Sequence, residues 1–222
     1  MILCLVTDRR RLGTALGLAA SEWVDALRAQ VLAAASAGVD LVQVREPDVE
    51  AAALARLVSV LVADTRQTAT RILVNDRLDV ALAAGAAGVH LKERSFSVAA
   101  ARGLAPPGFM VGRSIHTAST AVSAGMADYL IAGTVLPTVS KTSAVCLGWA
   151  GLSEVVKAAG GRPVLAIGGI DLPSIPFVAV SGAAGVAAIG AFIPGPGEAL
   201  SEFVQKRVID LRLGFDSAHA VS

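Results

Sequence analysis

Two apolar runs late in the chain end in glycine, the residue that lets backbone N–H groups come closest to a phosphate. The runs cover 164–167 and 185–189, about one βα unit apart. The phosphate-binding strands of a (β/α)8 barrel have this spacing, and a helix N-terminus beside them adds a favourable dipole. A Gly-Gly pair also occurs in plain turns. The pattern predicts a phosphate site built from Gly168, Gly169, Ile189 and Gly190.

Histidine is the side chain best suited to proton transfer near neutral pH, and the chain has three. His116 follows the apolar start of a strand and precedes a helical stretch, so we interpret it as a candidate acid/base residue. A capping role at the helix start is the alternative. His90 lies inside the apolar run 88–91, which favours a packed, hydrogen-bonded histidine over a catalytic one.

Polar side chains follow most of the other apolar runs. Amide and guanidinium donors at strand ends suit a phosphorylated anion, although strand ends are polar in any barrel. The loop 136–148 is longer than its neighbours, and its hydroxyls and lysine suit a lid over phosphate or carboxylate, with a solvated loop as the alternative. Asp76 alone is a poor Mg²⁺ site, because that ion usually takes one or two carboxylates plus phosphate. The candidate binding residues are Gln43, Arg45, Asn75, Thr138, Ser140 and Lys141.

These residues need a scaffold that brings many strand ends together. Short apolar runs alternate with alanine-rich helical stretches eight times along the chain, which is the number of βα units that closes a parallel barrel. The alternative is an open doubly wound sheet, but no early Gly-x-Gly-x-x-Gly follows a strand. The sequence therefore predicts a single-domain α/β (β/α)8 barrel over residues 1–214. Residues 215–222 are expected to form a disordered tail.

Composition excludes several partner classes. Hydrophobic residues make up 54% of the chain, enough for parallel strands buried on both faces. A net charge of +1 and few aromatic residues argue against nucleic acid and against an anionic membrane. Prolines and glycines interrupt the uncharged stretch 172–197, so it is interpreted as helix plus buried strand. The two cysteines have no metal or redox spacing, which favours a cytoplasmic location.

A set of motifs resembles one known family. In chain order they are TDR at 7–9, VQVRE at 42–46, VNDR at 74–77, GVHL at 88–91, GRSIH at 112–116, ADY at 127–129, PTVSK at 137–141 and AIGGI at 166–170. Their order and spacing resemble the thiamine monophosphate synthase/TenI family over nearly the whole chain. The resemblance implies a (β/α)8 barrel, in agreement with the alternation of elements.

The resemblance implies one of two activities. The synthase branch joins a pyrimidine pyrophosphate to a thiazole phosphate with magnesium, and the TenI-type branch includes thiazole tautomerases. The chain departs from the synthase pattern at Pro47, where synthases place a pyrophosphate-binding lysine, and at Ser95, where they place a magnesium-binding aspartate. Losing both groups weakens pyrophosphate binding. The segment 94–97 and the Ser-x-His segment ending at His116 are similar to the TenI-type branch.

From the resemblance, His116 is expected to be the acid/base residue of a thiazole tautomerase that needs no cofactor. Gly169, Ile189 and Gly190 are expected to hold the thiazole phosphate, with the 138–141 segment facing its carboxylate or phosphate. Two alternatives stay open. One is a thiamine monophosphate synthase using Asp76 for magnesium, and the other is a catalytically silent regulator that binds thiazole phosphate. Family members are often dimers, so a homodimer is a further possibility.

Overall fold

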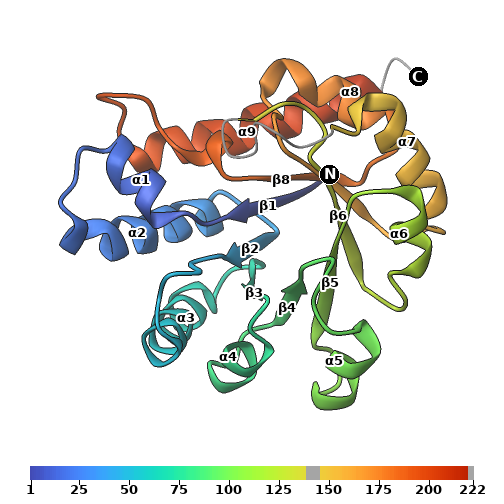
Figure 1. Ribbon diagram of the computed structural model, residues 1–222. Coiled ribbons are helices and arrows are strands. Elements are labelled where there is room, and N and C mark those ends of the chain that lie inside the picture. The colour runs from blue at the N-terminus through green and yellow to red at the C-terminus, as the bar shows by residue number, and fades with distance from the viewer. Residues whose placement is uncertain (139–145, 220–222) are drawn as a thin grey trace.

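Eight parallel strands form a closed barrel in the computed structural model, which describes residues 1–138 and 146–219 (Figure 1). Each strand pairs with the next in sequence, and β8 pairs with β1 to close the ring. The strands are β1 Ile2–Val6, β2 Leu41–Val44, β3 Arg71–Asn75, β4 Gly88–Leu91, β5 Met110–Ile115, β6 Tyr129–Gly133, β7 Val164–Ile167 and β8 Gly185–Ala188. The prediction of a (β/α)8 barrel is confirmed.

The strands are apolar throughout because both of their faces are buried. In β1, Leu3 and Leu5 pack toward the helices, whereas Cys4 and Val6 belong to a second cluster that fills the barrel interior. This interior cluster also contains Tyr129 and other large side chains. A barrel of this size encloses a packed core and not a pore, so a ligand site has to lie at one end.

Helices surround the barrel (Figure 1). The α-helices are α1 Arg9–Ala15, α2 Trp23–Ser36, α3 Ala51–Thr65, α4 Leu78–Ala83, α5 Val98–Leu104, α6 Ala118–Ser123, α7 Gly148–Ala158, α8 Ile175–Val180 and α9 Leu200–His219. Single turns of 3₁₀-helix occupy η1 Ala20–Glu22, η2 Leu172–Ser174 and η3 Gly190–Phe192. No helix within the described ranges is long and apolar enough to cross a membrane.

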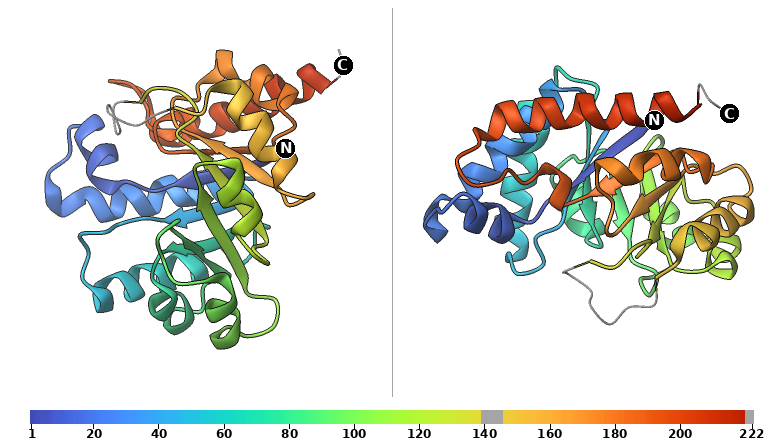
Figure 2. Two further views of the ribbon diagram at one scale, coloured as in Figure 1. Left: turned by 45° about the vertical axis from the view of Figure 1, so that its right-hand side comes forward. Right: turned by 90° about the horizontal axis from the view of Figure 1, so that it is seen from above.

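Both ends of the chain are helical close to the barrel. A short helix, α1, lies between β1 and α2, and Asp8 caps it by accepting a hydrogen bond from the Arg11 backbone N–H. At the other end, α9 runs to His219, so the expected disorder from residue 215 is wrong up to that point. The physical reason is burial: Leu211 and Phe215 lie one turn apart in α9 and are both buried. The helix packs across α2 and α8 (Figure 2).

Candidate active site

A cavity of about 880 Å³ opens at the end of the barrel where the strands finish. Its volume lies in the range of small-molecule sites, about 300–1,000 Å³. Most of the predicted site residues line it, namely Gln43, Arg45, Asn75, His116, Thr138, Gly168, Gly169, Ile189 and Gly190. Ser140 and Lys141 lie outside the described residues. The structure thus brings together side chains that are up to 147 positions apart, from Gln43 to Gly190.

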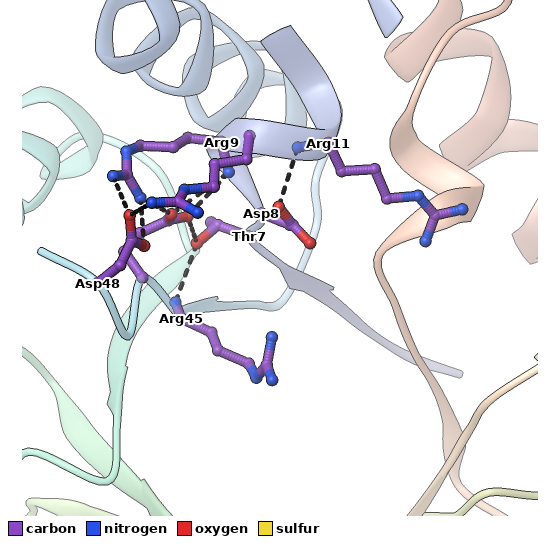
Figure 3. A network of polar contacts seen from close by, with 8 residues as sticks. Thr7, Asp8, Arg9, Arg11, Arg45 and Asp48 are labelled. Carbon is purple, nitrogen blue, oxygen red and sulfur yellow. Dashed lines mark hydrogen bonds and ion pairs between the residues drawn. The ribbon is translucent and has the colours of Figure 1, made fainter. Parts of the chain in front are cut away.

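A buried ion-pair network supports the β1 and β2 edge of the mouth (Figure 3). Glu46 is buried and accepts hydrogen bonds from the Thr7 hydroxyl at 2.7 Å and from the Arg9 guanidinium at 2.9 Å. Burial raises the pKa of the Glu46 carboxyl, although these hydrogen bonds oppose the rise. Arg9 also bonds Asp48 and holds the pKa of that carboxyl far below its usual range. The network is structural, and it fixes the neighbouring residues that face the cavity.

Arg45 extends from this network into the mouth. Its backbone N–H donates to the Thr7 hydroxyl at 2.9 Å, while its side chain points away from the network (Figure 3). No acidic side chain in the described ranges pairs with its guanidinium. A cation that lines a cavity without a counter-charge is suited to binding an anion. Arg45 is therefore placed as the sequence predicted for a residue that binds a phosphorylated ligand.

Two amide side chains lie beside each other on β2 and β3. The Gln43 Nε2 donates to the Asn75 Oδ1 at 2.9 Å, and both residues line the cavity. Gln43 is buried, yet its Oε1 has no hydrogen-bond partner among the described residues. Leaving a buried acceptor without a partner costs about 1–3 kcal/mol, so such an atom is expected to meet a ligand donor. The pair is a polar recognition point in the floor of the mouth.

Asp76 is engaged within the protein and does not offer free carboxylate oxygens. It adopts a left-handed backbone conformation, with a φ of 62°. Lys92 Nζ lies 2.7 Å from one carboxylate oxygen, and the Ser95 hydroxyl donates to the other. Burial tends to raise the pKa of Asp76, but the Lys92 and Ser95 contacts lower it below its ordinary value. The neighbouring Arg77 pairs with Asp79.

This arrangement does not fit magnesium, the ion that the synthase branch implies. Mg²⁺ requires accessible carboxylate oxygens in near-octahedral geometry. At Asp76 the Lys92 ammonium group already contacts one carboxylate oxygen, in the position that the ion would need. The described part of the chain contains no cluster of three or more His, Cys, Asp or Glu side chains placed to hold a metal ion. We therefore assign no chemical step to a metal.

The two histidines of the barrel differ in environment. His90 is buried, with Nδ1 3.0 Å from the Tyr129 hydroxyl and Nε2 2.8 Å from the Ser114 hydroxyl. Burial lowers the pKa of His90 to about 3, so its ring is neutral at physiological pH. The interpretation of His90 as a packed, hydrogen-bonded residue is confirmed. His90 lines the cavity, and its two ring nitrogens hold the hydroxyl groups of Tyr129 and Ser114 in place.

His116 follows β5 directly and is exposed at the mouth. Its Nδ1 contacts the Gly133 carbonyl oxygen. A carbonyl only accepts, so Nδ1 carries the proton, and in the neutral ring Nε2 is left as the acceptor. The strand β5 runs to Ile115, so His116 is the first residue beyond the barrel wall. His116 thus has the geometry that a general base requires, with one nitrogen anchored and the other available.

The opposite side of the mouth is built from backbone. Gly168 and Gly169 follow β7 with φ values of 98° and 69°, a conformation that other residues rarely adopt. A Cβ at Gly169 would lie 2.6 Å from the Leu136 Cβ, so this turn packs directly against the β6 loop. The Leu136 N–H donates to the Gly168 carbonyl and links the two loops. The glycines thus allow a close approach between the β6 and β7 loops, and their binding of a phosphate stays a prediction.

Several residues in or beside the cavity were not singled out as site residues from the sequence. Arg11 from α1, Arg94 from the β4 loop and Arg207 from α9 contribute positive charge to the lining. The Arg11 position followed an apolar strand in a run of three arginines, a usable signal, but Arg207 lies in the middle of a helix and had none. Arg113 does not line the cavity; its guanidinium donates to the carbonyls of Glu93, Ser95 and Phe96 and holds the β4 loop.

The fold and the site together define a class: (β/α)8 barrel proteins that bind phosphorylated small molecules at the carboxyl ends of their strands. Within that class, residues 15–192 match the thiamine monophosphate synthase family, and the chain belongs to this family of thiamine biosynthesis enzymes. That is the family whose motifs the sequence resembled.

Individual relatives agree with this assignment. The chain is 43% identical to a thiamine-phosphate synthase of Methanoregula boonei over 166 residues, covering 73% of this chain and 76% of that protein. It is 40% identical to a putative thiamine-phosphate synthase of Geobacter sulfurreducens, with 87% of each covered. A solved thiamine phosphate pyrophosphorylase from Pyrococcus furiosus superposes with a TM-score of 0.79 at 30% identity, and the match covers 98% of this chain and 96% of that one. These names favour the synthase alternative over the tautomerase interpretation.

Proposed function

We propose that this protein is a thiamine-phosphate synthase, which joins a pyrimidine pyrophosphate to a thiazole phosphate. One observation supports this most strongly: the lining of the cavity has two different regions whose groups are suited to binding anions. Arg45, Lys92 and Arg94 lie on the β2 and β4 side, and Gly168, Gly169 and Gly190 lie on the β7 and β8 side. Strands β3 and β7 are opposite each other in the closed ring. Two phosphorylated substrates need two such regions.

The charged side suits the pyrophosphate. The coupling breaks the bond to pyrophosphate, so negative charge develops on the leaving oxygen, and fixed cations near that oxygen stabilise the transition state. Arg45 has no counter-charge among the described acidic side chains, and Arg94 brings a second cation to the same edge. The free Oε1 of Gln43 is suited to accept a hydrogen bond from an amino group of the pyrimidine. The glycine side then holds the thiazole phosphate through backbone N–H groups.

The test is the coupling reaction itself. The purified chain is incubated with both substrates, with magnesium or with a chelator, and thiamine phosphate and pyrophosphate are measured as products. Equal amounts of both products above a no-enzyme control support the proposal. Because Lys92 already pairs with Asp76, we expect the reaction to need no metal. Product formation in the presence of the chelator tests this expectation. Binding of both substrates with no product in either condition contradicts the synthase and leaves a silent binding protein.

A second candidate is a thiazole tautomerase, and the geometry of His116 favours it. A proton shift needs one group that accepts and donates, and His116 presents Nε2 while Gly133 anchors Nδ1. The loss of the lysine at position 47 and of the aspartate at 95 is also compatible with this branch. Formation of the aromatic thiazole from its non-aromatic carboxylated tautomer separates the two candidates, because it requires no pyrimidine substrate.

A further inference from the structure

Three consecutive arginines begin α1, and they face different surroundings. Successive helical residues are rotated by about 100°, so neighbours in sequence cannot share a partner easily. Arg9 is tied to Glu46 and Asp48, and Arg10 pairs with Asp48 at 2.6 Å. Arg11 extends away from this network toward the β8 side of the mouth (Figure 3). Its neighbours thus have counter-charges, and Arg11 has none among the described acidic side chains.

The guanidinium of Arg11 lies directly over Gly190. A Cβ placed on that glycine would be 3.0 Å from Arg11 Nη2 and 3.5 Å from Cζ. Arg11 and Gly190 come from opposite ends of the chain, 179 positions apart, and both line the cavity. No hydrogen bond or ion pair within the described ranges uses the Arg11 guanidinium nitrogens. Five N–H donors therefore face a glycine loop without an acceptor.

The backbone of Arg11 is held in place independently of its side chain. Asp8 caps α1 and accepts from the Arg11 N–H at 3.0 Å, while Arg9 anchors the same turn through Glu46. The start of the side chain is thus fixed by two polar contacts. A guanidinium on a fixed stem, presented across a glycine loop, is arranged to bind a planar or tetrahedral oxyanion bidentately.

We propose that Arg11 is a ligand-binding residue that holds the phosphate of the thiazole substrate against Gly169 and Gly190. The proposal rests on the proposed function for the identity of the ligand. It adds a side-chain cation from α1 to the subsite that the sequence predicted from the backbone N–H groups of the glycine runs. Because the guanidinium contacts only the phosphate, it raises affinity for the phosphorylated thiazole and has no role toward the unphosphorylated thiazole alcohol.

The experiment compares Arg11→Met with Arg10→Met, a matched control that removes an adjacent arginine paired outside the cavity. Calorimetry measures the dissociation constant of each variant for the thiazole phosphate and for the thiazole alcohol. We expect Arg11→Met to bind the phosphate at least 10-fold more weakly and Arg10→Met to stay within 2-fold of wild type. Arg11→Lys, which retains one charge, should fall between. Binding of the alcohol should be the same in all four proteins.

Equal weakening by Arg11→Met and Arg10→Met overturns the proposal, as does a loss of alcohol binding that parallels the loss of phosphate binding. Thermal melting by circular dichroism checks that each variant is folded, and Arg11→Lys serves if the methionine variant is not. If wild type binds no thiazole phosphate, the proposed function fails instead. Inorganic phosphate then tests Arg11 by itself: an affinity unchanged in Arg11→Met rejects the role, and a 10-fold loss supports it.

Discussion

The two sides of the mouth bind anions by different means. On the β2 and β4 side, long charged side chains such as Arg45 and Lys92 reach the cavity from exposed positions. On the β7 and β8 side, glycine backbone forms the surface, and after β7 its geometry is set by φ values at Gly168 and Gly169 that only glycine adopts easily. Side chains adapt to a ligand and tolerate substitution, whereas a backbone cradle is rigid and is lost when a single Cβ is added. We therefore expect graded losses of ligand affinity from substitutions on the β2 and β4 side, and an abrupt loss of affinity from a substitution on the β7 and β8 side.

His116 belongs to neither side, and its substitution gives the largest expected effect. His116→Asn retains a hydrogen-bonding side chain but removes the titratable nitrogen. We expect any isomerisation of the thiazole to slow by about 100-fold or more, which is typical of removing a general acid/base. Coupling to the pyrimidine should slow by less than about 10-fold, because that step relies on the cations of the charged side. Rates of both reactions are measured on the same preparation.

The outcome for His116→Asn decides between the two candidate activities. A coupling rate that falls as steeply as isomerisation would give His116 a direct role in the synthase reaction. Isomerisation at the wild-type rate would remove His116 from the chemistry altogether. The fold should be unaffected, since the side chain is exposed and its hydrogen bond is with the Gly133 backbone carbonyl.

Gly169→Val tests the backbone side. The new side chain would meet the Leu136 Cβ at 2.6 Å and the Pro137 carbonyl at 2.7 Å, in a backbone conformation with a φ of 69°. We expect affinity for the thiazole phosphate to fall by ~10-fold or more, equivalent to ~1.4 kcal/mol. Isothermal calorimetry measures it.

Gly197→Val is the matched control for this change. Gly197 has a similar φ of 81°, but a Cβ there meets nothing within 4 Å. It therefore reproduces the backbone strain without the steric clash at the site. If both variants lose the same affinity, strain alone explains the effect and the glycine side does not hold the phosphate.

Arg45→Met tests the charged side and should produce a more moderate effect. Arg45 is exposed, so its charge-assisted contact is expected at the low end of the usual range, about 1.5 kcal/mol, and its removal should weaken pyrophosphate binding by about 10-fold. Thiazole phosphate affinity should stay unchanged, because Arg45 and Gly190 belong to different regions. Arg56→Met removes an exposed arginine of α3 that does not line the cavity and serves as the control. Equal losses for the two ligands would mean that the two regions are one site.

The smallest expected effect concerns pH. His90 has a folded-state pKa of about 3, well below the ~6.5 of an unfolded chain. Between these two pH values the unfolded state binds a proton on His90 that the folded state does not bind. Its contribution to stability is complete above pH ~6.5 and decreases as the pH falls toward the folded pKa. Thermal melting from pH 7.5 to 5.5 should show a decline that is shallower in His90→Gln. An identical decline in both proteins would contradict the burial effect.

The barrel was predictable because it depends on local patterns repeated many times. Strands such as β2 and β7 are short apolar runs in which both faces must be buried, and eight repeats with helices between them leave few topologies. The glycine pair at 168 and 169 was equally visible, because its role depends on backbone freedom and not on distant partners. The error at the C-terminus has the opposite origin: Phe215 is helical because it packs into a tertiary contact, which composition does not reveal.

The sequence alone determined the barrel class, the strand ends that form the mouth and nine of the residues that line it. Only the tertiary structure decided how charges are paired there. Lys92, 16 positions away, pairs with Asp76, the residue that the synthase alternative assigned to magnesium, and Gly190 lies beneath Arg11, one of three consecutive arginines. The physical reason is that a periodic pattern indicates only whether a residue faces inward, whereas the partner of a charge depends on which loops meet in space. The pairing of β3 with β4 brings Lys92 to Asp76, and closure of the ring between β1 and β8 brings Arg11 to Gly190.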